Sequence, residues 1–267
     1  MFTFDANIYM EYGICNMALA PLKAEASERS EIMTQVLFGE AFEILEWQEH
    51  WVKITTAYDN YTGWIGKLLF TNLDEADYNH IKQTPPAITN SAVTWAFKKP
   101  EMALLYLPFG SSLPFLEGDE CRVGDDYYAV PEVDEELEDT LIETAMQFLN
   151  APYLWGGRTH FGIDCSGLTQ AVFKLHGIKI DRDASQQALQ GELVTRIEDA
   201  KEGDLAFFAN AEGRITHVGI LLGDGNIIHA SGRVKIEQID EKGIYSEEQG
   251  KYTHQLALIK RYFNRQS

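Results

Sequence analysis

Short runs of alternating apolar and polar residues, rich in β-branched and aromatic side chains, occupy most of the first eighty positions. MTQVLFGEAFEILEW and HWVKITTAYDNYTGWIGKLLF are the clearest of these runs, with turns at Gly39-Glu40 and Asp59-Asn60. This pattern is typical of strands that bury one face. Thr84-Pro85-Pro86 then interrupts it with a stiff segment. We therefore predict a small all-β domain at residues 1–83.

A second strand-rich segment follows at residues 84–132, with the runs AVTWAFKK, MALLYLPFGSSLPFLEG and CRVGDDYYAVP. The segment predicts either a separate small barrel or a β-extension of the first domain. In the first domain, Trp51–Ile54 and Tyr61–Ile65 follow Gly39-Glu40 in a way that resembles the bacterial SH3-like barrel. The second segment resembles a more degenerate copy. The resemblance implies one or two SH3-like barrels ahead of the rest of the chain.

Helical spacing replaces the alternation after Pro131, and acidic residues crowd the first turns, where they complement the helix dipole. The apolar positions are Val133, Leu137, Leu141, Ala145 and Phe148. A second helix is predicted from about Cys165 to a stop at Gly177. Further along, we predict a helical piece at 184–190 and strands at 204–209, 215–222, 226–231 and 256–262. Helices followed by antiparallel strands indicate an α+β domain at residues 133–267.

Charge and composition narrow the possible partners. The 267 residues carry 22 basic and 41 acidic side chains, a formal net charge of −19. Such a charge repels phosphate, so we expect no nucleic-acid partner, and it also disfavours anionic membranes. No run reaches the ~20 apolar residues of a membrane span. We expect a monomer that acts without nucleic acid or membrane.

The N-terminus and the cysteines bear on location and redox chemistry. MFTFDANIYMEYG lacks the basic start and the unbroken apolar core of a signal peptide. A cytoplasmic location is therefore predicted, with an exported form whose leader has been removed as the alternative. Cys15, Cys121 and Cys165 are odd in number and show no metal-ligand spacing. We expect no metal and no other cofactor, and one thiol is left free for chemistry.

Cys165 is the candidate for that chemistry. A thiol attacks as its thiolate, and the dipole and unpaired N–H groups at a helix N-terminus lower its pKa. Gly162 breaks the chain ahead of it, Asp164 can cap the helix, and Ser166-Gly167 are small enough to admit a substrate. The same features also fit an ordinary helix start. Cys165 therefore needs a base before it counts as a nucleophile.

Two histidines downstream can supply that base. His217 begins one apolar strand and His229 lies near the end of the next, so His217 could take the thiol proton while His229 holds its other nitrogen. A hairpin loop of even length would place the two rings on opposite faces of the sheet. A three-residue loop at 223–225 or a bulge would make them diagonal neighbours, ~7–8 Å apart at the backbone. The hypothesis therefore requires an odd loop or a bulge at this turn.

The motifs Asp164–Leu168, Thr216–Ile220 and Ile228–Ala230 together resemble the NlpC family of bacterial cell-wall cysteine peptidases, papain-like enzymes with a Cys-His-His triad. The resemblance covers about residues 134–267. Leu221 departs from it, because the family often carries an aromatic residue there. The other histidines lack a comparable strand context and are expected to be surface or structural residues: His50, His80, His160, His176 and His254.

This resemblance assigns a role to each motif residue. Cys165 would be the nucleophile, His217 the general base and later acid, and His229 the orienting third member. Tyr153, in APYLWGG, matches a family tyrosine near the oxyanion, although it also fits a packed loop aromatic. The backbone N–H of Cys165 would be a further oxyanion donor.

An SH3-like barrel joined to such a catalytic domain resembles the γ-D-glutamyl-L-diamino-acid peptidases. These cut peptidoglycan stem peptides that have a free N-terminal L-alanine and release L-Ala-D-Glu, which implies recycling of released peptides. Carboxylates and hydroxyls suit recognition of the ammonium group. The candidates are Asp164, Ser166 and Asp183 in the catalytic domain and Tyr61 and Glu31 in the first barrel. Two alternatives stay open: an endopeptidase that acts on the intact wall, and an acyltransferase that uses the same Cys-His-His fold.

Overall fold

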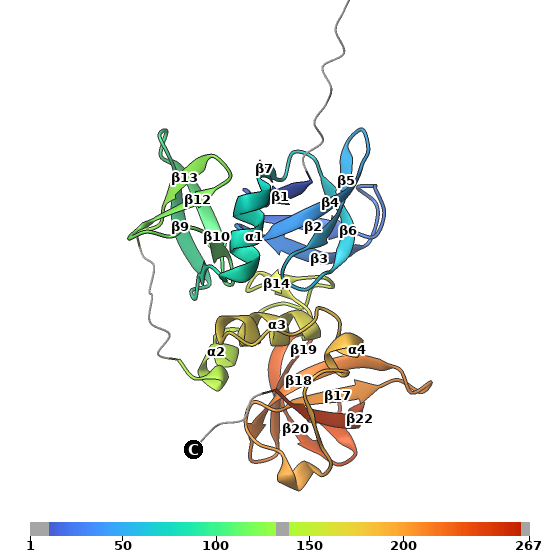
Figure 1. Cartoon of the computed structure of the whole chain (residues 1–267). Coiled ribbons are helices and arrows are strands. Elements are labelled where there is room, and N and C mark those ends of the chain that lie inside the picture. Colours follow the sequence, from blue (N-terminus) through green and yellow to red (C-terminus); the bar gives the residue numbers. More distant parts are fainter. Residues whose placement is uncertain (1–10, 132–138, 263–267) are drawn as a thin grey trace, which may run out of the picture. The chain divides into compact units, whose positions relative to one another are not determined.

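The chain forms two compact units in the computed structural model, which describes residues 11–131 and 139–262. One unit comprises residues 1–89 and 93–133, and the other comprises residues 90–92 and 134–267. Figure 1 shows strands and a short helix in the first unit, and helices together with a curved sheet in the second. Within the described residues, no helix combines the length and apolar character needed to cross a membrane.

A seven-stranded antiparallel sheet forms the first part of the N-terminal unit, in the order β3-β2-β6-β5-β4-β1-β7. Its strands are β1 (Tyr12–Ile14), β2 (Leu19–Lys23), β3 (Ile32–Leu37), β4 (Ala41–Trp47), β5 (Trp51–Thr56), β6 (Thr62–Gly66) and β7 (Thr71–Leu73). Alternate residues of β5 are buried, with Val52, Ile54 and Thr56 pointing inward. The all-β N-terminal region that the alternating pattern predicts is therefore confirmed.

The second strand-rich segment packs on the first. A four-stranded sheet, ordered β10-β9-β13-β12, and a β8–β11 pair make up this part. Residues from both segments, including Phe38 and Tyr78 of the first and Leu107 and Tyr128 of the second, share one hydrophobic cluster. The proposed boundary at residue 83 thus separates two sheets of one compact unit. The strands are β8 (Ala87–Ile88), β9 (Val93–Lys98), β10 (Ala103–Pro108), β11 (Ser112–Leu113), β12 (Glu120–Val123) and β13 (Asp126–Ala129).

A helix, α1 (Glu75–Gln83), lies where only strands were expected. Asp74 caps it, because its side chain accepts a hydrogen bond from the backbone N–H of Asp77 at 2.7 Å. Acidic residues in the first turn and Lys82 in the last complement the helix dipole. Only Tyr78 and Ile81 of the helix are buried. A narrow apolar stripe of two residues is too short for its helical period to stand out in the sequence.

The helices of the C-terminal unit precede its sheet, in the α+β order that the sequence predicts, although the unit is mostly β. Thr140 begins α2 (Leu141–Gln147) with a capping box. The upstream part of the helix predicted after Pro131, through residue 138, lies outside the described residues. The predicted second helix is confirmed as α3 (Cys165–Leu175), and Gly177 follows it with φ +68°. The remaining short elements are β14 (Arg158–Thr159), β15 (Gly162–Ile163), α4 (Ala184–Gln187) and the 3₁₀ turn η1 (Ile197–Asp199).

A seven-stranded antiparallel sheet, ordered β16-β22-β17-β18-β19-β20-β21, forms the rest of this unit. Because β21 also pairs with β22, the sheet closes on itself. Its strands are β16 (Glu192–Val194), β17 (Leu205–Ala209), β18 (Ile215–Gly223), β19 (Asn226–Ser231), β20 (Arg233–Asp240), β21 (Gly243–Ser246) and β22 (Lys251–Arg261). Helix α3 packs against β18 and β19. The four predicted strands are present, whereas β16, β20 and β21 were not anticipated.

The β18–β19 hairpin contains the bulge that the triad hypothesis requires. Asp224 and Gly225 form a two-residue turn, both with positive φ (48° and 72°), as type I′ hairpin turns have. The pairing then shifts by one residue between Leu221 and Gly223. As a result, Gly219 pairs with His229, not Ile220, and His229 shares a sheet face with His217.

Substitution of Gly219 by alanine is expected to destabilise the C-terminal unit by about 1–3 kcal/mol, because the new methyl group overfills a packed site. It would lie 2.7 Å from Ile227 Cδ1 and 2.9 Å from His229 Cβ. Urea unfolding measures the loss. Gly66→Ala is the control, because its methyl would meet Leu69 at an ordinary 3.5 Å. Equal stabilities of the two variants would contradict the packing seen in this hairpin.

Candidate active site

Cys165 occupies the first position of α3, as expected. Asp164 caps the helix by accepting a hydrogen bond from the backbone N–H of Gly167 at 2.7 Å. Cys165 is only 7% exposed. Burial and then the charge of Asp164 raise the pKa of its thiol to about 12, against the opposing effects of the Val218 backbone and of Arg182. The thiol is therefore neutral at rest and needs a base to become a nucleophile.

His217 and His229 lie together beside this thiol. Nε2 of His217 is 2.8 Å from Nδ1 of His229, within hydrogen-bonding distance, and both rings are buried. The backbone contact between Cys165 and Val218 places the sulfur next to the residue that follows His217. Burial, followed by the neighbouring histidines, lowers the pKa of His217 well below 6.5. A neutral imidazole beside a neutral thiol can accept its proton.

Glu237, on β20, completes this row of side chains and was not anticipated from the sequence. Its Oε2 lies 2.9 Å from Nε2 of His229, and its Oε1 accepts a hydrogen bond from Lys235 at 3.1 Å. Burial disfavours the charged carboxylate, but the contacts with His229 and Lys235 hold the pKa of Glu237 at about 2. The position of Glu237 follows from the pairing of β19 with β20. His229 pairs with Lys235, so Glu237, two residues further along β20, lies on the same face of the sheet.

His254, expected as a surface or structural residue, packs on the candidate base. Its ring stacks on that of His217, with centroids 4.1 Å apart and an interplanar angle of 25°. Burial lowers its pKa to about 4. The closure of the sheet through β22 brings it here, and local sequence patterns do not show such closure.

Among the described residues, one ring nitrogen each from His217, His229 and His254 lies within 4.8 Å of the others, a spacing compatible with a metal ion. The stacking of two of the rings argues against such a use. Imidazole lone pairs lie in the ring plane, so the lone pairs of two nearly parallel rings do not converge on one ion. The three histidines are therefore not arranged as a metal-ligand set.

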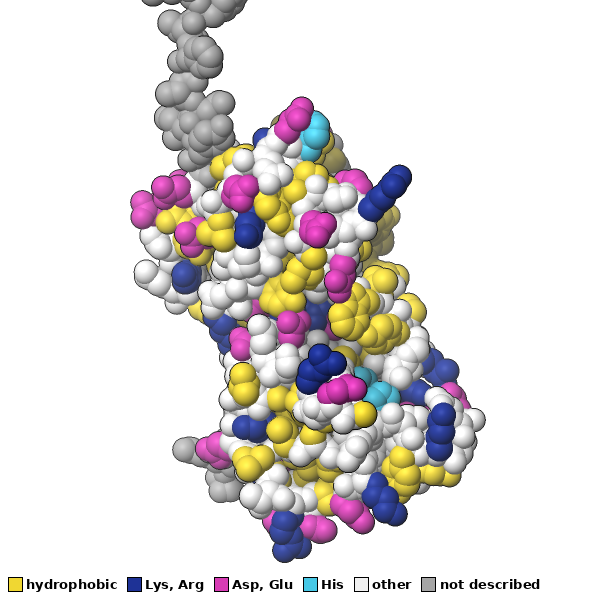
Figure 2. Space-filling model, turned by 90° about the vertical axis from the view of Figure 1, so that its right-hand side faces the viewer, with side chains coloured by type: hydrophobic (Ala, Val, Ile, Leu, Met, Phe, Trp, Pro, Cys, Tyr) yellow, Lys and Arg dark blue, Asp and Glu magenta, His cyan; other side chains and the backbone are white. Residues whose placement is uncertain are grey.

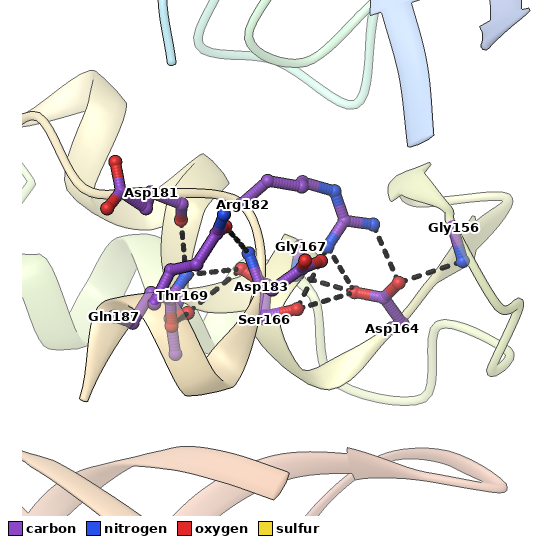
Figure 3. A network of polar contacts seen from close by, with 10 residues as sticks. Gly156, Asp164, Ser166, Gly167, Thr169, Asp181, Arg182, Asp183 and Gln187 are labelled. Carbon is purple, nitrogen blue, oxygen red and sulfur yellow. Dashed lines mark hydrogen bonds and ion pairs between the residues drawn. The ribbon is translucent and has the colours of Figure 1, made fainter. Parts of the chain in front are cut away.

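Asp164 and Ser166, two candidates for amine recognition, belong to a buried network with Arg182. The guanidinium of Arg182 donates to both carboxylate oxygens of Asp164, at 3.0 and 2.6 Å, and to the Ser166 hydroxyl at 2.9 Å. Gly156 donates its N–H to Asp164 from the other side at 2.8 Å (Figure 3). The bidentate pair neutralises the Asp164 charge inside the unit. Arg182 was missed because a single arginine in a loop carries no sequence signal.

The other predicted residues are distributed between the two units. Asp183 follows Arg182 directly and is the N-cap residue of α4. Tyr153 is half-buried, and its pKa is raised to about 12 by burial and then by Cys165 and Asp164, which places its hydroxyl near them. Tyr61 and Glu31 belong to the N-terminal unit. Their part in recognition stays a prediction.

Acidic and basic side chains are interspersed over the face that Figure 2 shows. Neither sign forms a single continuous area on that face, although the chain carries a net charge of −19.

Comparison with known proteins finds a family match in each of the two units. Residues 150–252 match the NlpC/P60 family, and residues 22–67 match the bacterial dipeptidyl-peptidase Sh3 domain. The chain is 31% identical to the γ-D-glutamyl-L-lysine dipeptidyl-peptidase of Bacillus subtilis, over 74% of this chain and 72% of that protein. The protein of the same name from Bacillus cereus is 30% identical, over 83% and 74%.

A solved structure agrees in fold. The crystal structure of an NlpC/P60 family protein from Bacillus cereus aligns with a TM-score of 0.78 at 22% identity, covering 94% of this chain and 99% of that one. The dipeptidyl-peptidase 6 of Lysinibacillus sphaericus is 27% identical over 84% of this chain and 90% of its own length.

Acidification is expected to destabilise the C-terminal unit as the pH falls below about 6.5. Burial lowers the pKa of His217, and lowers those of His160 and His254 to about 4. The unfolded chain would therefore bind protons that the folded unit excludes, so stability present above pH 6.5 is lost toward pH 4. Thermal unfolding across this range measures the effect.

His254→Phe provides the matched comparison, because it keeps an aromatic ring against His217 and removes one titrating group. Its melting temperature should fall less steeply with pH than that of the unchanged protein. A melting temperature that stays constant from neutral pH to about 4.5 in the unchanged protein would contradict the burial of neutral histidines.

Proposed function

The chain belongs to the NlpC/P60 family of cysteine peptidases, and we propose that it hydrolyses the γ-D-glutamyl-L-diamino acid bond of peptidoglycan stem peptides with a free N-terminal L-alanine, releasing L-Ala-D-Glu. One observation carries the proposal: relatives named γ-D-glutamyl-L-lysine dipeptidyl-peptidase match this chain at about 30% identity across most of its length. The similarity extends over 74–83% of the chain and therefore is not confined to the NlpC/P60 match at residues 150–252.

The arrangement of Cys165 and the two histidines supports acyl transfer through a thioester. His217 takes the thiol proton as the sulfur attacks the γ-carbonyl carbon of the D-glutamyl residue. The same proton then goes to the departing amine of the diamino acid, which leaves the L-Ala-D-Glu acyl group on the sulfur. Water, deprotonated by His217, then attacks the thioester carbon, the C–S bond breaks to release L-Ala-D-Glu, and the Cys165 sulfur recovers the proton from His217. Cys165 at the start of a helix and the two histidines on a sheet that packs against this helix are the parts that this chemistry needs.

The oxyanion of each tetrahedral intermediate needs donors near Cys165. The backbone N–H of Cys165 lies at the N-terminus of α3, where the helix dipole also favours negative charge. Tyr153 is the second candidate, because its hydroxyl lies near the thiol and, with its pKa raised to about 12, stays protonated. A protonated phenol can donate to the oxyanion throughout the working pH range.

The charges around Asp164 support recognition of a free ammonium group. Asp164 and Arg182 cancel one another, and the adjacent Asp183 leaves this group of three with one net negative charge. A peptide amine supplies the matching positive charge, with hydroxyl contacts available at Ser166. An acylated N-terminus, as in stems still linked to glycan, carries no positive charge, so it would lose the electrostatic attraction to these carboxylates. The site therefore favours released peptides over the intact wall.

The substrate preference is tested with L-Ala-γ-D-Glu-L-Lys and its N-acetyl twin. We expect the free tripeptide to be cut with a kcat/KM at least ~100-fold higher, since a site that pairs its charges and hydroxyls with an ammonium group rejects the uncharged analogue. Mass spectrometry of the products should show L-Ala-D-Glu and lysine, and the Cys165→Ala protein should give neither. Equal hydrolysis of both peptides, or release of fragments from purified sacculi at a similar rate, would instead support an endopeptidase of the intact wall.

Substitution of Asp183 by asparagine tests the amine pocket directly. It should lower kcat/KM for the free tripeptide by about 10- to 100-fold, the usual loss for a hydrogen bond to a charged group, and leave the slow cleavage of the N-acetyl peptide unchanged. Asp181→Asn, two residues earlier, is the matched control and should behave like the unchanged protein. An equal loss on both peptides would show that Asp183 acts on folding or on catalysis.

A further inference from the structure

Three side chains form a continuous row away from Cys165, and each contact in it has a defined length. His217 Nε2 lies 2.8 Å from His229 Nδ1, and His229 Nε2 lies 2.9 Å from Glu237 Oε2. The side chain of His229 is fully buried and that of Glu237 only 7% exposed, so water does not compete for these contacts. A third histidine, His254, stacks on His217, and Lys235 lies beside Glu237.

The Glu237 carboxylate, at the end of the row far from Cys165, determines which ring nitrogens carry protons. A carboxylate whose pKa is held near 2 can only accept, so His229 must donate from Nε2. A neutral imidazole carries one proton, and burial lowers the pKa of His229, so its Nδ1 is bare. That nitrogen then accepts from His217 Nε2–H, which leaves the Nδ1 of His217 bare. Only this tautomer of His217 has a lone pair left for the thiol proton.

We infer that Glu237 is a positioning residue that, through His229, fixes His217 in the one tautomer able to act as the base for Cys165. The inference rests on the proposed function of Cys165 as nucleophile. It adds a fourth group to the Cys-His-His set and assigns a use to an acid that does not touch the substrate. It also gives a role to Lys235, which lies beside Glu237: the ammonium group of Lys235 keeps the Glu237 carboxylate ionised.

Substitution of Glu237 by glutamine should reverse the direction of the hydrogen bonds in this row. The Lys235 ammonium attracts the amide oxygen, so the amide NH₂ turns to His229 and donates to its Nε2. His229 then carries its proton on Nδ1 and donates to His217 Nε2, which moves the proton of His217 to Nδ1, the nitrogen that should be the base. We expect kcat to fall about 100-fold, the size of a typical general-base contribution, with KM changed by less than about twofold.

Nitrogen-15 NMR of the histidine rings, recorded on the full chain without substrate, reads the tautomers directly. The unchanged protein at neutral pH should show His217 and His229 both protonated at Nε2, and the Glu237→Gln protein should show both protonated at Nδ1. The double variant Lys235→Met with Glu237→Gln should recover part of kcat, because the amide oxygen is free to turn back to His229. Glu248→Gln, an acid 60% exposed and paired with Arg233, is the control and should change neither readout.

Alkylation by iodoacetamide separates this inference from the choice of substrate. Cys15 and Cys121 are fully buried, so mass spectrometry follows Cys165 alone. The Glu237→Gln protein should react at least about tenfold more slowly at neutral pH, since its thiol lacks a base. A proton on Nδ1 of His217 in the unchanged protein, or unchanged tautomers and alkylation in the variant, would overturn the inference. Normal tautomer and alkylation responses without tripeptide hydrolysis would overturn only the proposed substrate.

Discussion

The pairing register of the β18–β19 hairpin is the constraint on which the candidate site depends. A single extra residue, between Leu221 and Gly223, sets Gly219 opposite His229 and so puts both histidines on one face of the sheet. Without that bulge every side chain of β19 would change face, and His229 would point away from His217. The absence of a side chain at Gly219 then gives His229 the room to approach. The chemistry therefore begins with a backbone irregularity and a glycine, not with the reactive groups themselves.

Burial also determines the charges in the site, and it affects the neutral groups and the ionised groups differently. It keeps the Cys165 thiol and the histidines neutral, so proton transfer starts from uncharged partners. The buried charges occur in compensated groups: Asp164 with Arg182, and Glu237 with Lys235. One group lies next to the nucleophile and the other at the far end of the histidine row. In each pair the cation offsets the cost of burying an isolated acid, so the carboxylate stays ionised beside its neighbours.

Much of this could be predicted from the sequence wherever the signal was local. The start of α3 at Cys165, its end before Gly177, and the two histidine strands follow from period, cap and turn residues. The sequence did not reveal what depends on distant pairing. Glu237 was one acid among 41, and its place became visible only through the β19–β20 register. His254 reaches His217 because the sheet closes, and α1 shows only two buried residues, too few for a recognisable helical pattern.

The central claim is that Cys165 attacks a peptide whose free amine is held by the charge group around Asp164. A crystal structure of the Cys165→Ala protein with L-Ala-γ-D-Glu-L-Lys tests it most directly. The γ-carbonyl carbon should lie next to residue 165, and the L-alanyl ammonium should lie within hydrogen-bonding distance of Asp183 and Ser166. A peptide bound with its amine in solvent, or with its γ-carbonyl away from residue 165, would contradict it.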